Sequence, residues 1–200
     1  MINGAERIIG LYRRHAHLWA ERRGDRLMEA HWLDRFRNLL PAKANVLDLG
    51  CGSGKPIARY LIEKGCEVTG VDSSPEIIEL CRESFPKSEW RVADMRELSL
   101  ERRFDGIIAW DSFFHLGFDD QRQMFPIFRA HAAPDAALMF TSGPAHGEAI
   151  GEFEGESLYH ASLASEEYNL LLSANDFEVV AHALEDPTCG KHTIWLARQR

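Results

Sequence analysis

The sequence predicts an α/β fold in which helices cover both faces of a mainly parallel sheet. Short apolar runs alternate with segments of helical periodicity through the middle of the chain, and this order is typical of parallel sheets. Four of the apolar runs end in a carboxylate or next to one. Because parallel strands end at the same edge of a sheet, the pattern predicts a ligand site along that edge.

Length and composition fit one globular domain. The chain has 200 residues, of which 45% are hydrophobic, enough for a buried core. Lys and Arg number 23 against 31 Asp and Glu, a formal net charge of −8, which disfavours binding to nucleic-acid phosphates. With no signal-peptide pattern and no apolar run of membrane-spanning length, we expect a cytoplasmic monomer or homodimer that binds neither nucleic acid nor membrane.

The cysteine spacing gives no sign of a metal site. The chain has no CxxC pair and no cysteine cluster; its four cysteines are Cys51, Cys66, Cys81 and Cys189. A zinc or iron–sulfur site needs closer spacing. We therefore expect no bound metal and reduced thiols.

The first strand and its loop are the stretch VLDLGCGSG at residues 46–54. Glycines at alternate positions let the backbone turn sharply and let a ligand approach it, which a Cβ would prevent. A helical pattern follows Lys55 and Pro56, and proline suits the first turn of a helix. The spacing is GxGxG, which differs from the GxGxxG of dinucleotide-binding loops.

Three further apolar runs carry an acidic residue at their ends. EVTGVD ends in Asp72, RVADMREL contains Asp94, and FDGIIAWDSFFHL contains Asp111. A carboxylate at the end of the second strand can accept both hydroxyls of a ribose. The alternative for Asp72 is that it caps the helix that begins near Pro75.

These four motifs resemble, in order, the class I S-adenosylmethionine (SAM)-dependent methyltransferases. The resemblance is close over residues 44–143 and topological elsewhere. It implies a Rossmann-like seven-stranded sheet in the order 3-2-1-4-5-7-6 with strand 7 antiparallel, SAM as cofactor and S-adenosyl-L-homocysteine as product. We expect a single domain over residues 1–200, with an N-terminal helical cap (1–43), a SAM-binding half (44–143), a substrate-side insertion (144–163) and a C-terminal helix and strand pair (164–200).

The resemblance places the cofactor along the strand ends. The residues expected to contact it are Asp48, Gly50, Cys51, Gly52, Gly54, Asp72, Ser73, Ile77, Ala93, Asp94, Met95, Trp110 and Asp111. Asp48 supports the loop in that family, or caps nearby amides, and is expected to be ionised in either case. Asp94 would accept from the adenine amino group, and the Met95 amide would donate to a ring nitrogen. Ile77 would pack against adenine or in the core, and Trp110 and Asp111 would contact the methionine part.

The helical cap is interpreted in two ways. Residues 1–43 have the periodicity of two amphipathic helices, divided at Gly24 and ended by Pro41. They carry nine Lys or Arg against five Asp or Glu. The cap is either packed on the sheet edge with its charges in solvent or, as in the family, a lid over the acceptor. Tyr12, His15 and Trp19 share one face and would line the acceptor pocket; the positive charge hints at an acidic acceptor.

The acceptor side is predicted from the residues after the fourth strand. Phe113 and Phe114 would face the acceptor, and aromatic rings, including those of Tyr12, Trp19 and Trp110, would suit a cationic donor. His115 is the candidate general base, with a structural histidine at a turn as the alternative. The segment from Asp111 to Phe114 lacks the proline-rich tetrapeptide of amide and base N-methylating family members, which argues against nucleic-acid base methylation.

The last part of the chain predicts an insertion and an edge hairpin. Residues 144–162 are long for a plain connection, and Gly147, Gly151 and Gly155 there are expected in hairpin turns. Tyr159 and His160 would face the acceptor or pack within that hairpin. A helix at 164–174 precedes two runs at 177–184 and 192–198, which predict an antiparallel pair at the sheet edge.

The sequence thus predicts an enzyme that transfers the methyl group of SAM to an oxygen or nitrogen of a small-molecule acceptor. Two alternatives remain. A SAM-binding protein without catalysis would have the same pocket, and an NAD-linked oxidoreductase would have a related loop, although with different glycine spacing.

Overall fold

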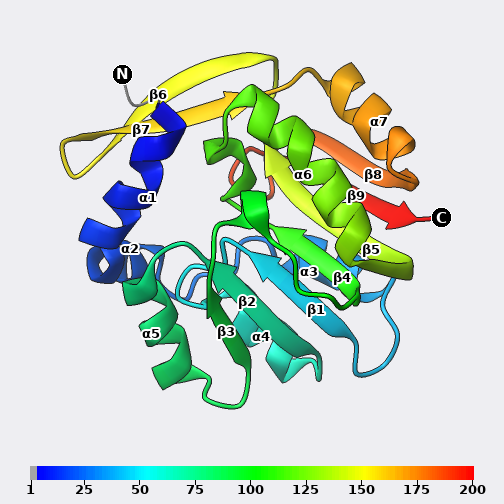
Figure 1. Ribbon diagram of the computed structural model, residues 1–200, viewed down its shortest axis with the longest axis horizontal. Helices are drawn as coiled ribbons and strands as arrows, with labels where there is room; N and C mark the ends of the chain where they lie inside the picture. The colour runs from blue at the N-terminus through cyan, green and yellow to red at the C-terminus, as the bar shows by residue number, and fades with distance from the viewer. Residues whose placement is uncertain (1–3) are drawn as a thin grey trace.

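The computed structural model describes residues 4–200, which form a seven-stranded sheet and a separate two-stranded hairpin (Figure 1). The sheet order is β3-β2-β1-β4-β5-β9-β8, and β9 is antiparallel to both of its neighbours. This confirms the predicted order with an antiparallel seventh strand. The strands are β1 (Asn45–Leu49), β2 (Glu67–Asp72), β3 (Glu89–Val92), β4 (Phe104–Ala109), β5 (Ala132–Ser142), β8 (Phe177–Asp186) and β9 (His192–Gln199).

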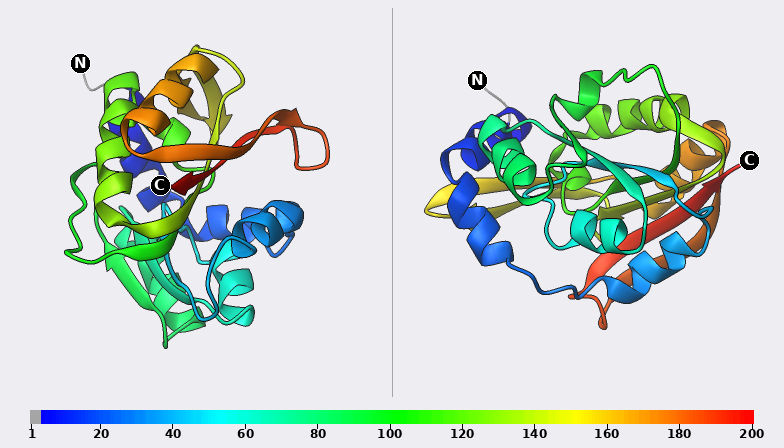
Figure 2. Two further views of the ribbon diagram at one scale, coloured as in Figure 1. Left: turned by 90° about the vertical axis from the view of Figure 1, so that its right-hand side faces the viewer. Right: turned by 90° about the horizontal axis from the view of Figure 1, so that it is seen from below.

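Helices cover both faces of the sheet (Figure 2). Helices α3 (Ala30–Arg37), α4 (Ile57–Glu63) and α5 (Pro75–Ser84) cover one face, and α6 (Phe118–His131) and α7 (Ser165–Ala174) cover the other. Neighbouring residues of a central strand serve opposite cores: Ile107 packs with α6, and Ile108 packs with α3. Burial on both faces explains why these strands are continuous apolar runs in the sequence.

The N-terminal segment contains three helices where the sequence predicts two. Helices α1 (Gly4–Arg14) and α2 (Ala16–Arg23) are separated at His15, and α3 follows the predicted break at Gly24. The predicted helical segment starts at Met1, and residues 1–3 of it lie outside the described residues. Only α3 packs on the sheet, whereas α1 lies beside the hairpin and α2 contacts α5 (Figure 1). The interpretation of the cap as helices packed on the sheet therefore applies to α3, and the interpretation as a lid can apply only to α1 and α2.

The insertion folds as the antiparallel hairpin of β6 (Gly147–Phe153) and β7 (Glu156–Ser162). Of the three glycines expected in turns, only Gly155 is in one, next to Glu154, and both have positive φ angles of 76° and 54°. Such angles suit a two-residue hairpin turn. The expectation is wrong for the other two glycines. Gly147 is the first residue of β6, and Gly151 lies within β6, where it pairs with Leu158 of β7.

No helix within the described part of the chain is long and apolar enough to cross a lipid bilayer.

A buried polar network ties the end of the hairpin to α6 and α7. The Tyr168 hydroxyl donates to Gln121 Oε1 at 2.6 Å and accepts from the Leu163 N–H at 3.0 Å. The Gln121 amide in turn donates to the carbonyls of Leu116 and Ala161, both at 2.9 Å. The strand that leads out of the hairpin is therefore fixed to the helical layer by hydrogen bonds shielded from water.

We expect Tyr168→Phe to lower the free energy of unfolding by about 1–3 kcal/mol, because it leaves a buried N–H and a buried amide oxygen without partners. Urea denaturation measures this change. Tyr60→Phe is the matched control, since the Tyr60 hydroxyl binds the side chain of Asp34 near the surface and its loss should change stability by less than about 0.5 kcal/mol. Equal effects of the two substitutions would contradict the role of the network.

Candidate functional site

The glycine loop after β1 is held close to the end of β2. The N–H groups of Gly50 and Cys51 donate to the Val71 carbonyl at 2.8 and 3.0 Å. Gly50 and Gly52 have φ angles of 69° and 53°, a region that favours glycine. A Cβ on Gly50 would lie 2.2 Å from Ser112 Cβ, and one on Gly52 would lie 2.4 Å from the Trp19 ring. Both positions therefore require glycine for conformation and for space.

Asp72 joins this loop to the start of α5. Its two carboxylate oxygens accept from the N–H groups of Gly52 at 3.2 Å and Ser74 at 3.0 Å. Burial raises the pKa of Asp72 to about 6, while backbone hydrogen bonds oppose the shift. The N-cap of α5 is Ser74, whose hydroxyl accepts from the Ile77 N–H at 3.2 Å. Ser74 is thus the N-cap residue, while Asp72 binds the Ser74 N–H and also lines a cavity.

Asp94 lies at the end of β3 and is held by Arg96. The guanidinium contacts both carboxylate oxygens, at 2.6 to 3.1 Å, and also reaches Asp120 at 3.1 Å. Burial raises the pKa of Asp94, but the hydrogen bonds from Arg96 outweigh it and the net shift is downward. Arg96 thereby forms part of the wall of a cavity.

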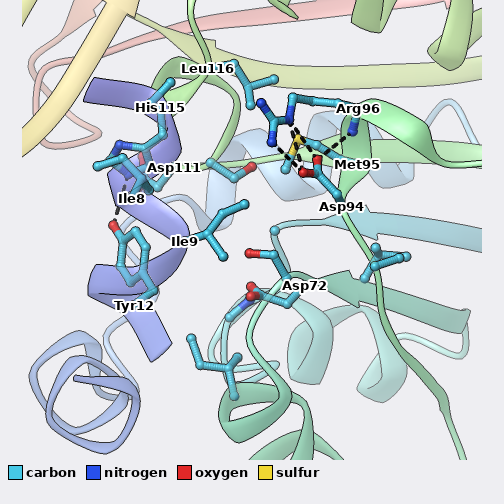
Figure 3. Close-up of a pocket in the computed structure, with 18 of the residues that line it drawn as sticks. Ile8, Ile9, Tyr12, Asp72, Asp94, Met95, Arg96, Asp111, His115 and Leu116 are labelled. Carbon is cyan, nitrogen blue, oxygen red and sulfur yellow. Dashed lines mark hydrogen bonds and ion pairs between the residues drawn. The ribbon is translucent and has the colours of Figure 1, made fainter. Parts of the chain in front are cut away.

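The loop, Asp72 and Asp94 surround one cavity that encloses about 710 Å³, partly open to solvent. Figure 3 shows the carboxylates of Asp72, Asp94 and Asp111 on its walls. Nine of the residues predicted to contact the cofactor line it: Gly50, Gly52, Asp72, Ser73, Ile77, Ala93, Asp94, Met95 and Asp111. Seven further residues for which no role was predicted also line the cavity: Ala5, Ile8, Ile9, Val71, Arg96, Ser112 and Leu116. The apolar periodicity of α1 is the one sequence signal that includes Ile8 and Ile9.

Helices α1 and α2 form the roof of this cavity. Tyr12 and Trp19 line it, with their rings edge to face at 5.8 Å, and the Trp19 ring lies against Gly52. The arginines of the roof pair with acidic residues of the hairpin and of α5: Arg13 with Glu76, Arg14 with Glu156 and Arg22 with Glu154. The positive charge of this segment is therefore directed at the protein itself, and it no longer supports an acidic acceptor.

His115 is buried between the cavity and the hairpin. Its Nδ1 lies 2.8 Å from the Tyr159 carbonyl, and its Nε2 lies 2.9 Å from the Tyr12 hydroxyl. Because a carbonyl only accepts, Nδ1 carries the proton and Nε2 accepts from Tyr12. Burial lowers the pKa of His115 to about 4, and burial raises the pKa of Tyr12. Both groups are therefore neutral at physiological pH, and the His115 lone pair is directed at the cavity roof.

Four residues predicted to contact the cofactor do not line the cavity: Asp48, Cys51, Gly54 and Trp110. Gly54 faces Phe85 and Trp90. Asp48 is buried, and burial together with the charge of Asp72 raises its pKa to about 7. The expectation of a firmly ionised Asp48 is wrong, because burial in an apolar core disfavours the charged form.

Several residues that were predicted to face the acceptor do not line this cavity either. Phe113 is wholly buried among Phe125, Phe128 and Phe140, so its predicted contact with the acceptor is wrong.

The other predicted acceptor residues contact the hairpin. The His15 side chain binds Glu156 at 2.8 Å. The Tyr159 hydroxyl binds Glu148 at 2.6 Å, as the packed-hairpin alternative has it. The rings of Phe114 and His160 lie with centroids 5.1 Å apart and planes tilted by 48°, and both residues line a second cavity beneath the hairpin. Within residues 4–200, no three His, Cys, Asp or Glu side chains are grouped as a metal site.

The raised pKa of Asp48 makes stability depend on pH. The carboxyl pKa is about 3.9 in an unfolded chain, so the folded protein retains a proton between about pH 4 and 7 that the unfolded chain has lost. The free energy of unfolding should therefore fall as pH rises through this window. Asp48→Asn should remove this contribution and be more stable than wild type at pH 8, by roughly 2 kcal/mol.

Urea denaturation at pH 4.5 and pH 8 measures the difference. Asp25→Asn is the control, because its side chain is exposed and forms a surface pair with Arg59. An Asp48→Asn protein with the same pH dependence as wild type would show that Asp48 is ionised in the fold.

Comparison with known proteins agrees with this geometry. Residues 46–135 match the methyltransferase domain family. A magnesium-protoporphyrin O-methyltransferase of Rhodobacter capsulatus is 30% identical over 130 residues, which are 62% of this chain and 55% of that protein. A dTDP-3-amino-3,6-dideoxy-alpha-D-glucopyranose N,N-dimethyltransferase of Streptomyces fradiae is 31% identical over 101 residues, 50% of this chain and 37% of that protein. The matches thus span about half or less of these relatives' lengths.

The fold is shared over a longer stretch. The structure of the 1,6-didemethyltoxoflavin N1-methyltransferase of Burkholderia thailandensis, with its substrate and S-adenosylhomocysteine bound, superposes with a TM-score of 0.74. The two are 22% identical, and the superposition covers 100% of this chain and 91% of that one. An amino pentose methyltransferase from Micromonospora echinaspora, CalS10, solved with SAM bound, gives a TM-score of 0.70 at 20% identity, over 89% and 93% of the two chains.

Proposed function

We propose that the chain is a class I SAM-dependent methyltransferase, which binds SAM and transfers its methyl group to an oxygen or nitrogen of a small-molecule acceptor. The match of residues 46–135 to the methyltransferase domain family and the fold shared with a SAM-bound methyltransferase support this proposal. The observation that carries the proposal is the meeting of the glycine loop and the Asp72 carboxylate at one cavity. The relatives include O- and N-methyltransferases named for small molecules. This supports a methyltransferase over an NAD-linked oxidoreductase and over a binding protein without catalysis.

The residues of the cavity fit the cofactor. Gly50 and Gly52 line the cavity and add no side chain to its wall, so a cofactor laid on this loop would meet its backbone. The Trp19 ring, which packs against Gly52, would border the cofactor there. Asp72 would accept the ribose hydroxyls, and Asp94, Met95 and Ile77 would hold the adenine. When bound, SAM supplies a methyl group on a positively charged sulfur.

The remaining walls would orient the acceptor and exclude water. Methyl transfer is an in-line displacement that depends mainly on positioning, and the roof of α1 and α2 provides an apolar cover over the strand ends. Tyr12 of this roof donates to His115 Nε2 below it. We assign the two as a proton relay: the Tyr12 hydroxyl would take the proton of the acceptor while it passes its own proton to His115 Nε2.

The Asp72 carboxylate gives the direct test of cofactor binding. Asp72→Asn should weaken SAM binding by more than about tenfold, because an amide cannot accept two hydroxyl hydrogen bonds as a carboxylate does. Wild-type affinity should also fall as pH drops through about 6, where Asp72 takes up a proton, and this dependence should vanish in the variant. Isothermal titration calorimetry at pH 5, 6, 7 and 8 measures both effects.

Glu79→Gln is the matched control, because Glu79 lies on the exposed surface of the same helix and pairs with Arg82. Unchanged SAM affinity in Asp72→Asn would refute the ribose assignment. Affinity for NADH but not for SAM would refute the proposed function.

The lowered pKa of His115 predicts the pH profile of methyl transfer. Since His115 is neutral above about pH 4, kcat at saturating SAM should stay flat between pH 6 and 8. His115→Ala should slow transfer by about a hundredfold while SAM affinity is retained. The acceptor for this assay is the compound that takes up tritium from labelled SAM in a metabolite extract.

A kcat that rises through pH 6.5 in wild type, and not in His115→Ala, would instead assign His115 an ordinary imidazole pKa. Wild-type turnover in His115→Ala would remove it as the base.

A further inference from the structure

His192, the first residue of β9, lies behind the cavity wall and contacts Asp111. Its Nε2 is 2.9 Å from Asp111 Oδ1, and its Nδ1 is 2.7 Å from the Cys189 carbonyl. A carboxylate and a carbonyl can only accept, so both ring nitrogens must carry a proton for both hydrogen bonds to form. Both hydrogen bonds therefore form only when His192 is an imidazolium. No motif in the sequence singles out this residue.

The surroundings of His192 favour the charged ring. The ring stacks on Trp110 with centroids 5.4 Å apart and planes at 29°, an arrangement in which an aromatic face attracts a cation. The hydrogen bond that His192 donates to Asp111 raises the pKa of His192, and the charge of Glu29, which precedes α3, acts in the same direction, while burial opposes both. Glu29 is itself paired with Arg23.

The backbone of Asp111 is held in an uncommon conformation. Its φ angle is 50°, a left-handed region that residues other than glycine rarely adopt. The Asp111 N–H donates to Thr141 Oγ1 at 2.9 Å, so neighbours from β5 and β9 hold the backbone and the side chain. One carboxylate oxygen thus binds His192, while the residue lines the cavity.

We propose that His192 is a positioning residue: as an imidazolium it fixes the Asp111 carboxylate on the cavity wall, ready to accept from the ammonium group of the methionine part of SAM. This inference rests on the proposed function for its ligand, but the ion pair between the two side chains exists without any ligand. Without the His192 ring, the Asp111 side chain should be free to rotate. The resulting loss of SAM affinity should therefore depend on the presence of the Asp111 carboxylate.

The ion pair is tested on the protein without ligand. Nitrogen-15 NMR of the imidazole rings, with His192 identified by its loss in His192→Gln, should show both nitrogens protonated at pH 7. In Asp111→Asn the same ring should lose its proton at a lower pH than in wild type. A His192 ring that is neutral at pH 7, or that titrates identically in Asp111→Asn, would overturn the proposal.

The positioning role is tested by a double-mutant cycle on SAM binding. His192→Gln and Asp111→Asn should each weaken SAM binding by about tenfold, and the double variant should bind no more weakly than Asp111→Asn. Additive losses would overturn the proposal, because a structural effect of His192 would not depend on Asp111. His182→Gln is the control: His182 stacks on Trp195 in the same strand pair without contacting Asp111.

The two hypotheses fail differently. If wild-type protein does not bind SAM, the proposed function fails, and the NMR titration still decides whether His192 and Asp111 form an ion pair. If wild type binds SAM and His192→Gln binds it equally well, the proposed function stands and the positioning role is refuted.

Discussion

The hydrogen bonds that Asp72 accepts from Gly52 and Ser74 are the interaction on which the rest of the site depends. They connect the loop after β1 to the loop after β2, the two segments that leave the sheet at its centre. Without them, the Gly52 N–H would lose its partner, and the hydrogen bond from Cys81 Sγ of α5 to the Gly52 carbonyl would remain to hold the loop to that helix. The raised pKa of Asp72 is the cost of placing this acceptor out of water.

Charge also organises the outer wall of the cavity. The N-terminal segment is basic within an acidic chain, and its arginines and His15 meet glutamates of the β6–β7 hairpin and of α5. Arg22 also lies over the Phe153 ring at 5.5 Å. Such pairs are individually weak in solvent, but several of them join α1 and α2 to segments far away in the sequence. The roof and the hairpin are thus one electrostatic unit above the strand ends.

The carboxylates of the strand ends could be predicted from the order and spacing of the apolar runs, and the sheet order followed from the family resemblance of the four motifs. Prediction from the sequence failed where function depends on which way a side chain turns in a short irregular segment. Phe113 and His115 are two residues apart in one 3-10 turn (Phe113–His115), yet one is core and the other faces the cavity. The roles of Arg96 and His192 were missed because their contacts join distant parts of the chain: Arg96 also binds Asp120, 24 positions away, and His192 binds Asp111, 81 positions away.

The three carboxylates of the cavity differ in how their charge is balanced, and this difference fits the proposed ligand. Asp94 is paired with Arg96, and Asp111 is paired with His192. Asp72 forms no ion pair with any Lys, Arg or His of residues 4–200, and only backbone N–H groups face it. The cavity therefore carries one unbalanced negative charge in a partly buried site, where a ligand cation is attracted more strongly than in water. SAM carries a sulfonium charge that its demethylated product lacks, so under the proposed function this unbalanced carboxylate would hold the product less firmly than the donor.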